Sequence, residues 1–183
     1  MPSEEYVVLV DEADRVLGEA PKRSVHDGET PLHRGFSLFL FDREGRTLLQ
    51  RRAATKATWP GVWSNGCCGH PALGESPLDA ARRRAADELG VAVDDLWVAL
   101  PAYRYRAELA GVVENELCPV MVGRLAAPPR PNPAEVGAIE WRDWDAFLAA
   151  LEREPSPYSP WCREEARLLE RLPEFRAWRS SAR

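Results

Sequence analysis

Apolar and polar positions along the first fifty residues alternate with the period of β-strands. Tyr6 to Val10 and Val16 to Ala20 are short apolar-rich runs separated by a polar segment, which predicts a hairpin. Phe36 to Asp42 is apolar at nearly every position, as expected for a central strand that is covered on both faces. After a polar turn, Arg46 to Arg52 is predicted as the antiparallel partner of this strand.

Further along the chain, apolar positions recur with the spacing of an α-helix. The segment from Leu78 to Leu89 has an apolar stripe formed by Leu78, Ala81, Ala85 and Leu89. The ends of this predicted helix are marked by Ser76 as N-cap, Pro77 at the first helical position and Gly90 as the stop.

The rest of the chain continues the same mixture of elements. Further strands are predicted at Trp97 to Arg106, Val112 to Leu125 and Gly137 to Trp141, and further helices at Asp143 to Arg153 and Pro160 to Trp178. The proline-rich segment 128–133 is interpreted as a stiff connector inside the domain. Together with a length of 183 residues, the pattern predicts a single domain spanning 1–183. The predicted fold class is α/β (α+β), with a mixed β-sheet sandwiched between helices.

Composition and charge restrict the binding partners and the cellular compartment that are expected for this chain. A net charge of −5 gives no general attraction to nucleic acid or to anionic membranes. No apolar run approaches the length of a membrane span, and the N-terminal residues lack the basic and apolar regions of a signal peptide. The four cysteines form no disulfide framework, so reduced thiols and a cytoplasmic location are expected. A monomer is favoured.

Two short motifs carry most of the candidate chemistry. The stretch Asn65 to Ser76 contains thiols, an imidazole and a carboxylate and runs into the helix that ends near Leu89. A second acidic motif, Val113 to Pro119, follows about twenty-five residues later. Together with the positions of the three histidines, these motifs indicate a metal-dependent enzyme.

The first motif resembles the Nudix box. The resemblance rests on Gly69, on Glu75 after five intervening residues, and on the segment Arg83 to Val91. In that family the loop and helix present carboxylates to a divalent ion that holds a diphosphate. The hydrolase box has glutamate at the position of Arg84, so this chain resembles a Nudix scaffold with a different reaction. Glu88 remains as a carboxylate that is well placed to bind one ion.

A wider resemblance extends from about Val7 to the last helix. In order along the chain, the segments 59–65, 68–71, 74–76, 104–106, 114–116 and 159–161 resemble the type I isopentenyl-diphosphate isomerase family. That family interconverts isopentenyl and dimethylallyl diphosphate for isoprenoid synthesis. The resemblance therefore implies a small-molecule diphosphate substrate and a Nudix-like fold.

The residues support a metal site independently of the family. Glu114 and Glu116 are two apart in a predicted strand and share one face in an apolar context. Burying two like charges together is costly unless a cation compensates them, although a solvated edge strand is the alternative. The resemblance implies one metal site formed by His26, His33, His70, Glu114 and Glu116. Such ligands suit Mn²⁺, Fe²⁺ or Zn²⁺ better than Mg²⁺.

The diphosphate implies a second ion, Mg²⁺, which prefers oxygen ligands and needs few carboxylates. The resemblance implies that Glu88 and the main-chain carbonyl of Cys68 bind it. It also implies that the phosphates are neutralised by Lys22, Arg52, Lys56 and Arg84. Taken singly, each of these cations is expected to be a solvated surface charge, and Glu88 a surface acid paired with Arg84.

Shifting a double bond requires one proton to be added and another to be removed. The resemblance assigns these steps to Cys68 and Glu116, and an ordinary thiol, mostly protonated at neutral pH, suits a donor. Tyr105 and Trp161 correspond to aromatic residues of the family that would face a carbocation. Cys67 is expected to point away from Cys68, and Cys118 and Cys162 to be packing residues.

Two other functions stay open from the sequence. One is a Nudix-type hydrolase of nucleoside or other diphosphates, which Arg84 argues against. The other is a binding or regulatory module in which the metal site is closed and carries out no chemistry.

Overall fold

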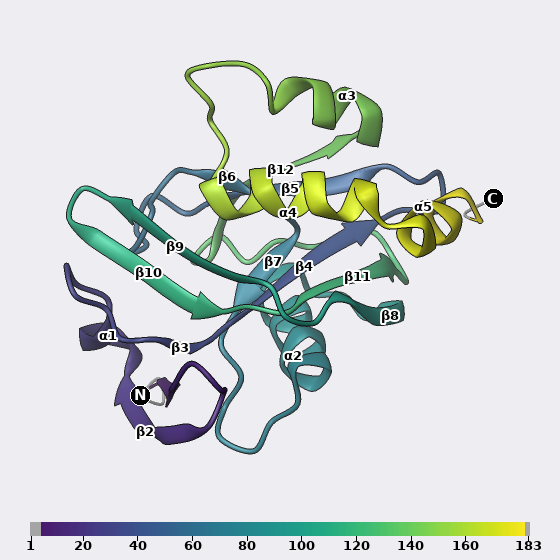
Figure 1. Ribbon diagram of the computed structural model, residues 1–183. Coiled ribbons are helices and arrows are strands. Elements are labelled where there is room, and N and C mark those ends of the chain that lie inside the picture. Colours follow the sequence, from purple (N-terminus) through teal and green to yellow (C-terminus); the bar gives the residue numbers. More distant parts are fainter. Residues whose placement is uncertain (1–4, 182–183) are drawn as a thin grey trace.

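Two β-sheets make up the framework of the chain (Figure 1). The protein is described by a computed structural model that covers residues 5–181. The smaller sheet has the order β2-β1-β3-β10-β9, with β1 (Tyr6–Val10), β2 (Val16–Pro21), β3 (His33–Arg34), β9 (Arg104–Leu109) and β10 (Val112–Leu117). The larger sheet has the order β12-β5-β4-β11-β8, with β4 (Phe36–Phe41), β5 (Thr47–Arg52), β8 (Val93–Leu100), β11 (Val120–Leu125) and β12 (Val136–Arg142). Two short strands, β6 (Trp63–Ser64) and β7 (Cys67–Gly69), pair with β5 and β4.

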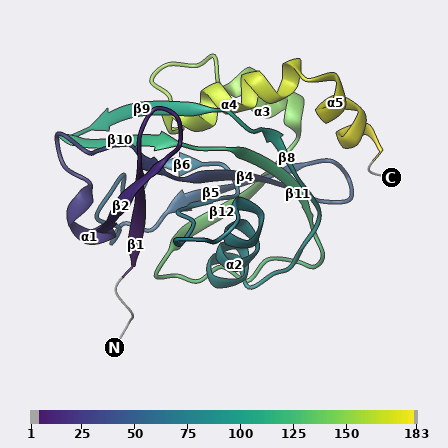
Figure 2. The same ribbon diagram turned by 60° about the horizontal axis from the view of Figure 1, so that its bottom comes forward.

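Helices cover both faces of the larger sheet. Figure 2 shows α2 (Pro77–Leu89) on one side and α3 (Trp144–Ala150), α4 (Pro160–Arg171) and α5 (Pro173–Ser180) on the other. The remaining helix, α1 (Lys22–Val25), follows directly after β2. The predicted mixed sheet between helices is confirmed, and the smaller sheet is an addition to it. No helix within residues 5–181 combines the length and the apolar character that a membrane span requires.

The central strand β4 explains how the two helical layers are held. Phe36, Leu38 and Leu40 belong to the core beneath α2. Phe39 and Phe41 belong to the core beneath α3, α4 and α5. Because successive side chains of a strand point to opposite faces, one buried strand anchors both cores. The predicted double burial of this segment is therefore confirmed, since every residue of β4 is buried.

The predicted boundaries of α2 are also confirmed. The Ser76 side chain accepts a hydrogen bond from the Asp79 amide at 3.1 Å, and Pro77 is the first helical residue. Gly90 ends the helix in the left-handed region, with φ of 61°, which glycine adopts without strain. Local capping signals therefore place this helix, on which part of the site is built.

Three predicted elements are wrong because each continues through a proline. The predicted strand 97–106 is divided between β8 and β9 at Pro101, and the predicted strand 112–125 between β10 and β11 at Pro119. The predicted helix 160–178 is divided between α4 and α5 at Pro173. Proline has no amide hydrogen and restricts the residue before it, so periodicity alone overestimates the length of each element. The second division matters most, because it sends β10 and β11 into different sheets.

Helix α4 contains a buried glutamate, Glu165, whose burial was not predicted from the sequence. The side chain of Glu165 is fully buried, and neither of its carboxyl oxygens has a hydrogen-bond partner among the described residues. Burial raises the pKa of Glu165 well above its ordinary value, and the nearby Glu116 raises it further. The group is therefore a buried acid whose ionisation opposes folding.

We predict that Glu165→Met stabilises the fold, and more so at high pH. The pKa of Glu165 is higher in the folded protein than in the unfolded chain. The folded protein is therefore relatively most stable below the unfolded pKa, and it loses this stability as pH rises through the folded pKa. Removing an unpaired buried polar group is worth about 1–3 kcal/mol. Thermal melts at pH 5 and pH 8 measure the effect, with the exposed Glu174→Met as the matched control. An equal gain in melting temperature for both variants at both pH values contradicts the prediction.

Candidate metal and catalytic site

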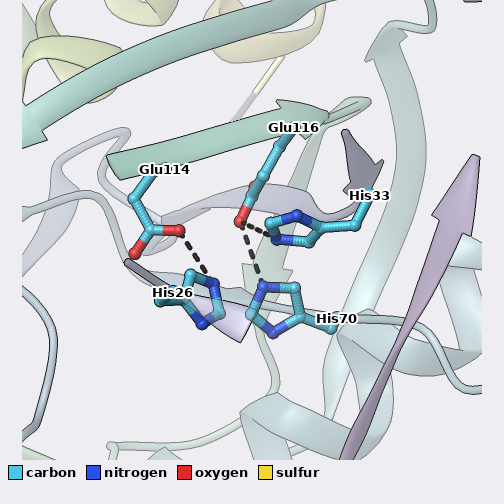
Figure 3. Close-up of side chains that lie close together, drawn as sticks. All are labelled: His26, His33, His70, Glu114 and Glu116. Carbon is cyan, nitrogen blue, oxygen red and sulfur yellow. Dashed lines mark hydrogen bonds and ion pairs between the residues drawn. The ribbon is translucent and has the colours of Figure 1, made fainter. Parts of the chain in front are cut away.

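Five side chains from four segments converge on one point (Figure 3). One ligand atom from each residue lies within 4.8 Å of those of all the others. The cluster consists of His26 after α1, His33 in β3, His70 after β7, and Glu114 and Glu116 in β10. These are the residues predicted from the sequence to form the metal site.

Sheet geometry places the two carboxylates. Glu114 and Glu116 are alternate residues of β10, so both side chains lie on the same face of the strand. In the parallel pairing of β10 with β3, Glu116 lies opposite His33. Both carboxylates are buried, with 7% and 6% of their surfaces exposed, so the alternative of a solvated edge strand is wrong.

The imidazoles are oriented by backbone carbonyls. His26 Nδ1 lies 3.2 Å from the Lys22 carbonyl oxygen and His33 Nδ1 lies 2.9 Å from that of Pro31. If each Nδ1 carries the hydrogen and donates it, the Nε2 lone pair of each ring faces the carboxylates. His26 Nε2 is then 3.1 Å from Glu114 Oε2, and His70 Nε2 is 3.1 Å from Glu116 Oε1.

The protonation states suit cation binding. Burial lowers the pKa of His70 to about 4, which keeps this ring neutral at physiological pH. Burial alone raises the pKa of Glu116, but hydrogen bonds with His33 and His70 outweigh burial and leave the pKa well below its ordinary value. Within residues 5–181, His26 Nε2 and Glu114 Oε2 lie 3.1 Å apart, and neither buried atom has a hydrogen-bond partner. Burial alone lowers the pKa of His33, but its hydrogen bond with Glu116 outweighs burial and leaves the pKa above its ordinary value. Ring nitrogens and carboxylate oxygens that face one another fit a divalent cation, whose binding releases any proton that the imidazoles hold.

One cavity of about 650 Å³ adjoins this cluster. Every predicted site residue except His33, which lies fully buried behind the wall, lines it. The predicted residues on its wall are Lys22, His26, Arg52, Lys56, Cys68, His70, Arg84, Glu88, Tyr105, Glu114, Glu116 and Trp161. Segments far apart in the sequence therefore contribute to one substrate-sized space.

Cys68 and Cys67 face opposite cores, as predicted. Cys67 is fully buried in the core beneath α2, whereas Cys68 packs toward the other core and lines the cavity. The Cys68 thiol donates a hydrogen bond to Asn65 Oδ1, at 3.3 Å. Burial, together with the nearby Glu165, raises the pKa of Cys68 to about 12. The thiol is therefore protonated at neutral pH.

Aromatic rings form part of the cavity wall beside this thiol. The ring of Tyr105 stacks on that of Trp161 with centroids 5.2 Å apart, and Trp161 in turn meets Trp59 edge to face at 4.9 Å. Cys118 and Cys162 are buried in the same core, as their predicted packing role requires.

The basic residues of the cavity are all paired with other protein groups. Lys22 forms an ion pair with Glu5, at 2.5 Å, and Lys56 one with Glu135, at 2.6 Å. Arg84 contacts Glu88, as the surface-pair alternative expected, but both residues are buried in the cavity wall. Arg52 is oriented differently, because its Nε and Nη2 donate to the Thr58 carbonyl and hydroxyl oxygens at 3.1 and 3.2 Å. Sequence reasoning did not identify Glu5 or Glu135.

The loop before α2 is fastened to the helix. Arg83 Nε and Nη2 donate to the two carboxylate oxygens of Glu75 at 2.8 and 2.7 Å. The same guanidinium donates to the His70 carbonyl oxygen at 3.3 Å, and Glu75 accepts from the Ala72 amide at 2.8 Å. This bidentate pair therefore holds the turn that carries His70 against the helix that carries Arg84 and Glu88.

Comparison with known proteins agrees with these features. The family model described as "NUDIX domain" matches residues 31–162. An isopentenyl-diphosphate Delta-isomerase of Mycolicibacterium vanbaalenii is 50% identical over 167 residues, which covers 91% of this chain and 92% of that protein. One of Leifsonia xyli subsp. xyli is 51% identical over 163 residues and covers 87% and 88% of the two chains. This chain belongs to the isopentenyl-diphosphate Delta-isomerase family of NUDIX-domain proteins.

Solved structures with a similar fold are found for this isomerase-family chain. The crystal structure of DR0079 from Deinococcus radiodurans superposes with a TM-score of 0.70 at 24% identity, covering 90% of this chain and 98% of that one. A MutT protein from Methanosarcina mazei Go1 gives a TM-score of 0.61 at 19% identity, covering 77% and 94%. At such identities the likeness concerns the fold alone.

A glycine beside the cluster gives a test of the metal site in this family member. A Cβ atom at Gly35 would lie 2.0 Å from Glu116 Oε2 and 2.5 Å from its Cδ. We predict that Gly35→Ala displaces the Glu116 carboxylate and lowers the affinity for Mn²⁺ or Zn²⁺ about tenfold or more, since supporting residues have effects of this size. The fold should persist, because only the end of one side chain has to move.

Calorimetric titration with each metal measures this affinity, and circular dichroism checks folding. Gly28→Ala is the matched control, because a Cβ atom there would be 3.7 Å from the Gly111 carbonyl oxygen, an ordinary contact. Equal metal affinities in the two variants would show that the carboxylate position at Glu116 does not govern binding.

Proposed function

We propose that this protein interconverts isopentenyl and dimethylallyl diphosphate, with Cys68 and Glu116 as the proton-transfer pair. The observation that carries the proposal is that a protonated thiol and an ionised, histidine-bound carboxylate line the same cavity. Membership in the isopentenyl-diphosphate Delta-isomerase family supports the reaction, and the presence of Cys68 and Glu116 on the wall of one cavity supports the choice of residues. The product would enter isoprenoid biosynthesis.

The reaction needs two separate proton carriers. The electron pair of the terminal double bond forms a new C–H bond, which leaves a tertiary carbocation. A second C–H bond on the neighbouring carbon then gives its electron pair to the new double bond. The raised pKa keeps the Cys68 thiol protonated at neutral pH, so it holds a proton to donate, and the lowered pKa keeps Glu116 ionised, so it can accept one.

The surroundings of the thiol suit a cation that must not meet water. Tyr105 and Trp161 present aromatic surface to the cavity, and negative ring faces stabilise a nearby positive charge. Neither ring carries a nucleophile strong enough to capture the carbocation. Exclusion of water by these walls would also prevent hydration of the intermediate.

The five-residue cluster fits a divalent transition metal, for which we propose Mn²⁺, Zn²⁺ or Fe²⁺. His26, His33 and His70 supply borderline nitrogen donors, and Glu114 and Glu116 supply oxygens. Bound there, the ion would fix the Glu116 carboxylate and tune its basicity. The other residues of the cluster orient that carboxylate toward the cavity.

The substrate diphosphate would be bound by the basic side of the cavity. We propose that Lys22, Arg52, Lys56 and Arg84 donate to its oxygens. Glu88 and the main-chain carbonyl of Cys68 would bind the accompanying Mg²⁺, because this ion takes few protein carboxylates together with phosphate oxygens. A cytoplasmic monomer without nucleic-acid or membrane partners remains a prediction, and the four free cysteines suit a reducing compartment.

The two alternatives are disfavoured by particular residues. A hydrolase would need additional carboxylates for its metal ions, whereas Arg84 brings a positive charge to the helix position where hydrolases carry glutamate. A closed regulatory metal site would have no use for a cavity of about 650 Å³ with Cys68 on its wall.

We predict that purified protein supplied with Mg²⁺ and Mn²⁺ converts isopentenyl diphosphate to dimethylallyl diphosphate. Nuclear magnetic resonance follows the shift of the double bond, and a phosphate assay runs on the same samples. Release of phosphate from this substrate or from nucleoside diphosphates should not exceed that of the buffer. Phosphate release without isomerisation supports the hydrolase instead.

We predict that Cys68→Ala lowers kcat by about 10²–10⁴-fold, the usual contribution of a general acid. Cys67→Ala is the matched control, because the two thiols are adjacent but face opposite cores. In deuterated water, wild type and Cys67→Ala should place deuterium in the product, whereas Cys68→Ala should not complete the isomerisation. Near wild-type turnover by Cys68→Ala rules out the proposed role of this thiol.

A further inference from the structure

One carboxylate oxygen in the cavity is the meeting point of two predicted phosphate-binding cations. Glu135 Oε2 lies 2.6 Å from Lys56 Nζ and 3.2 Å from Arg84 Nη2. A phosphoryl oxygen is recognised by the same charge-assisted contacts from lysine and arginine. The oxygen of Glu135 therefore stands where these two side chains would hold an oxygen of a diphosphate.

The backbone of the proline-rich connector holds Glu135 in this position. The Asn132 amide donates to the Glu88 carbonyl oxygen at 2.8 Å, which ties the connector to the end of α2. The Glu135 amide donates to the Asn132 carbonyl oxygen at 3.0 Å, and the Ala53 amide donates to the Glu135 carbonyl oxygen at 3.0 Å. Glu135 is thus fastened on both sides, just before β12, and its side chain lines the cavity.

Several cations act on this one group. Burial alone raises the pKa of Glu135, but its hydrogen bond with Lys56 and the charges of Lys56, Arg84 and Lys22 leave the pKa below its ordinary value. The side chain is therefore ionised at neutral pH. It is three-quarters buried, with 25% of its surface exposed, so solvent screens these contacts less than those of a surface pair.

We propose that Glu135 is a built-in competitor of the diphosphate for Lys56 and Arg84. The inference rests on the proposed function, because it takes these cations to be the diphosphate site. A diphosphate oxygen that takes the contacts now made by Glu135 Oε2 with Lys56 Nζ and Arg84 Nη2 must displace this carboxylate from them. When the product leaves, the carboxylate recaptures both cations and speeds the release.

Competition by Glu135 would prevent slow release of the product. Substrate and product carry the same diphosphate, so contacts with it bind both equally and do not accelerate the chemical step. If these contacts were unopposed, product release would become slow. A tethered carboxylate opposes them at every turnover without weakening the groups that transfer protons.

The test is binding of inorganic diphosphate in the presence of Mg²⁺ to wild type, Glu135→Gln and Glu140→Gln. Calorimetry gives the dissociation constant, and stopped-flow displacement gives the dissociation rate. Glutamine keeps the shape and one acceptor oxygen but not the charge. Glu140 is a matched control on β12, because it pairs with Arg142 and is not among the residues that line the cavity.

We expect Glu135→Gln to bind inorganic diphosphate about tenfold or more tighter, a change of about 1.4 kcal/mol, and to release it correspondingly more slowly. Glu140→Gln should behave as wild type, and Glu135→Asp, which keeps the charge, should not bind more tightly. Unchanged or weaker binding by Glu135→Gln overturns the proposal, as does an equal gain in Glu140→Gln. Because no isomerisation is measured, tighter binding by Glu135→Gln upholds the competition even if the wild type fails the isomerase assay.

Discussion

Two carboxylates buried on the same face of one strand form the constraint on which the rest of this structure depends. Glu114 and Glu116 are almost inaccessible to water, and like charges so placed repel each other unless other groups compensate them. Three imidazoles face them from segments before β3, within β3 and after β7, and the five groups together fit a divalent cation that would compensate the two charges. The cluster therefore ties the smaller sheet, through β3 and β10, to the loop that leads from the larger sheet into α2.

The same principle governs the opposite side of the cavity with the signs exchanged. There, Lys22, Lys56 and Arg84 are the groups that need compensation, and Glu5 and Glu135 provide it. An ionised group in the cavity wall is thus tolerated because it has a partner nearby. A ligand with the same charge as such a partner can take its place. The basic side of the cavity is therefore suited to exchanging its carboxylate partners for an anion.

Sequence reasoning succeeded where the signal is local and failed where it is not. The ends of α2 were predicted because Ser76, Pro77 and Gly90 are themselves the caps. His70, Glu114 and Glu116 were found because they lie in motifs of recognisable spacing, whereas His26 and His33 were assigned through the family resemblance that those motifs supported. Glu135 was missed, since a charged residue after a proline-rich connector carries no sign that it faces inward. Glu165 was missed for a similar reason, because a single acid on an amphipathic helix is expected to face solvent.

Arg84 shows how one position can redirect a common scaffold. It lies one helical turn before Glu88, so both side chains project from the same side of α2 into the cavity. A carboxylate at position 84 would stand beside Glu88 and Glu135, and three negative groups so close together favour the gathering of several metal ions. Arginine instead pairs with both carboxylates, and in the proposed function its positive charge binds the diphosphate. The helix sets where the side chain at position 84 points. On the proposed function, the sign of its charge then decides whether the cavity would bind several cations, as a hydrolase does, or the anionic diphosphate.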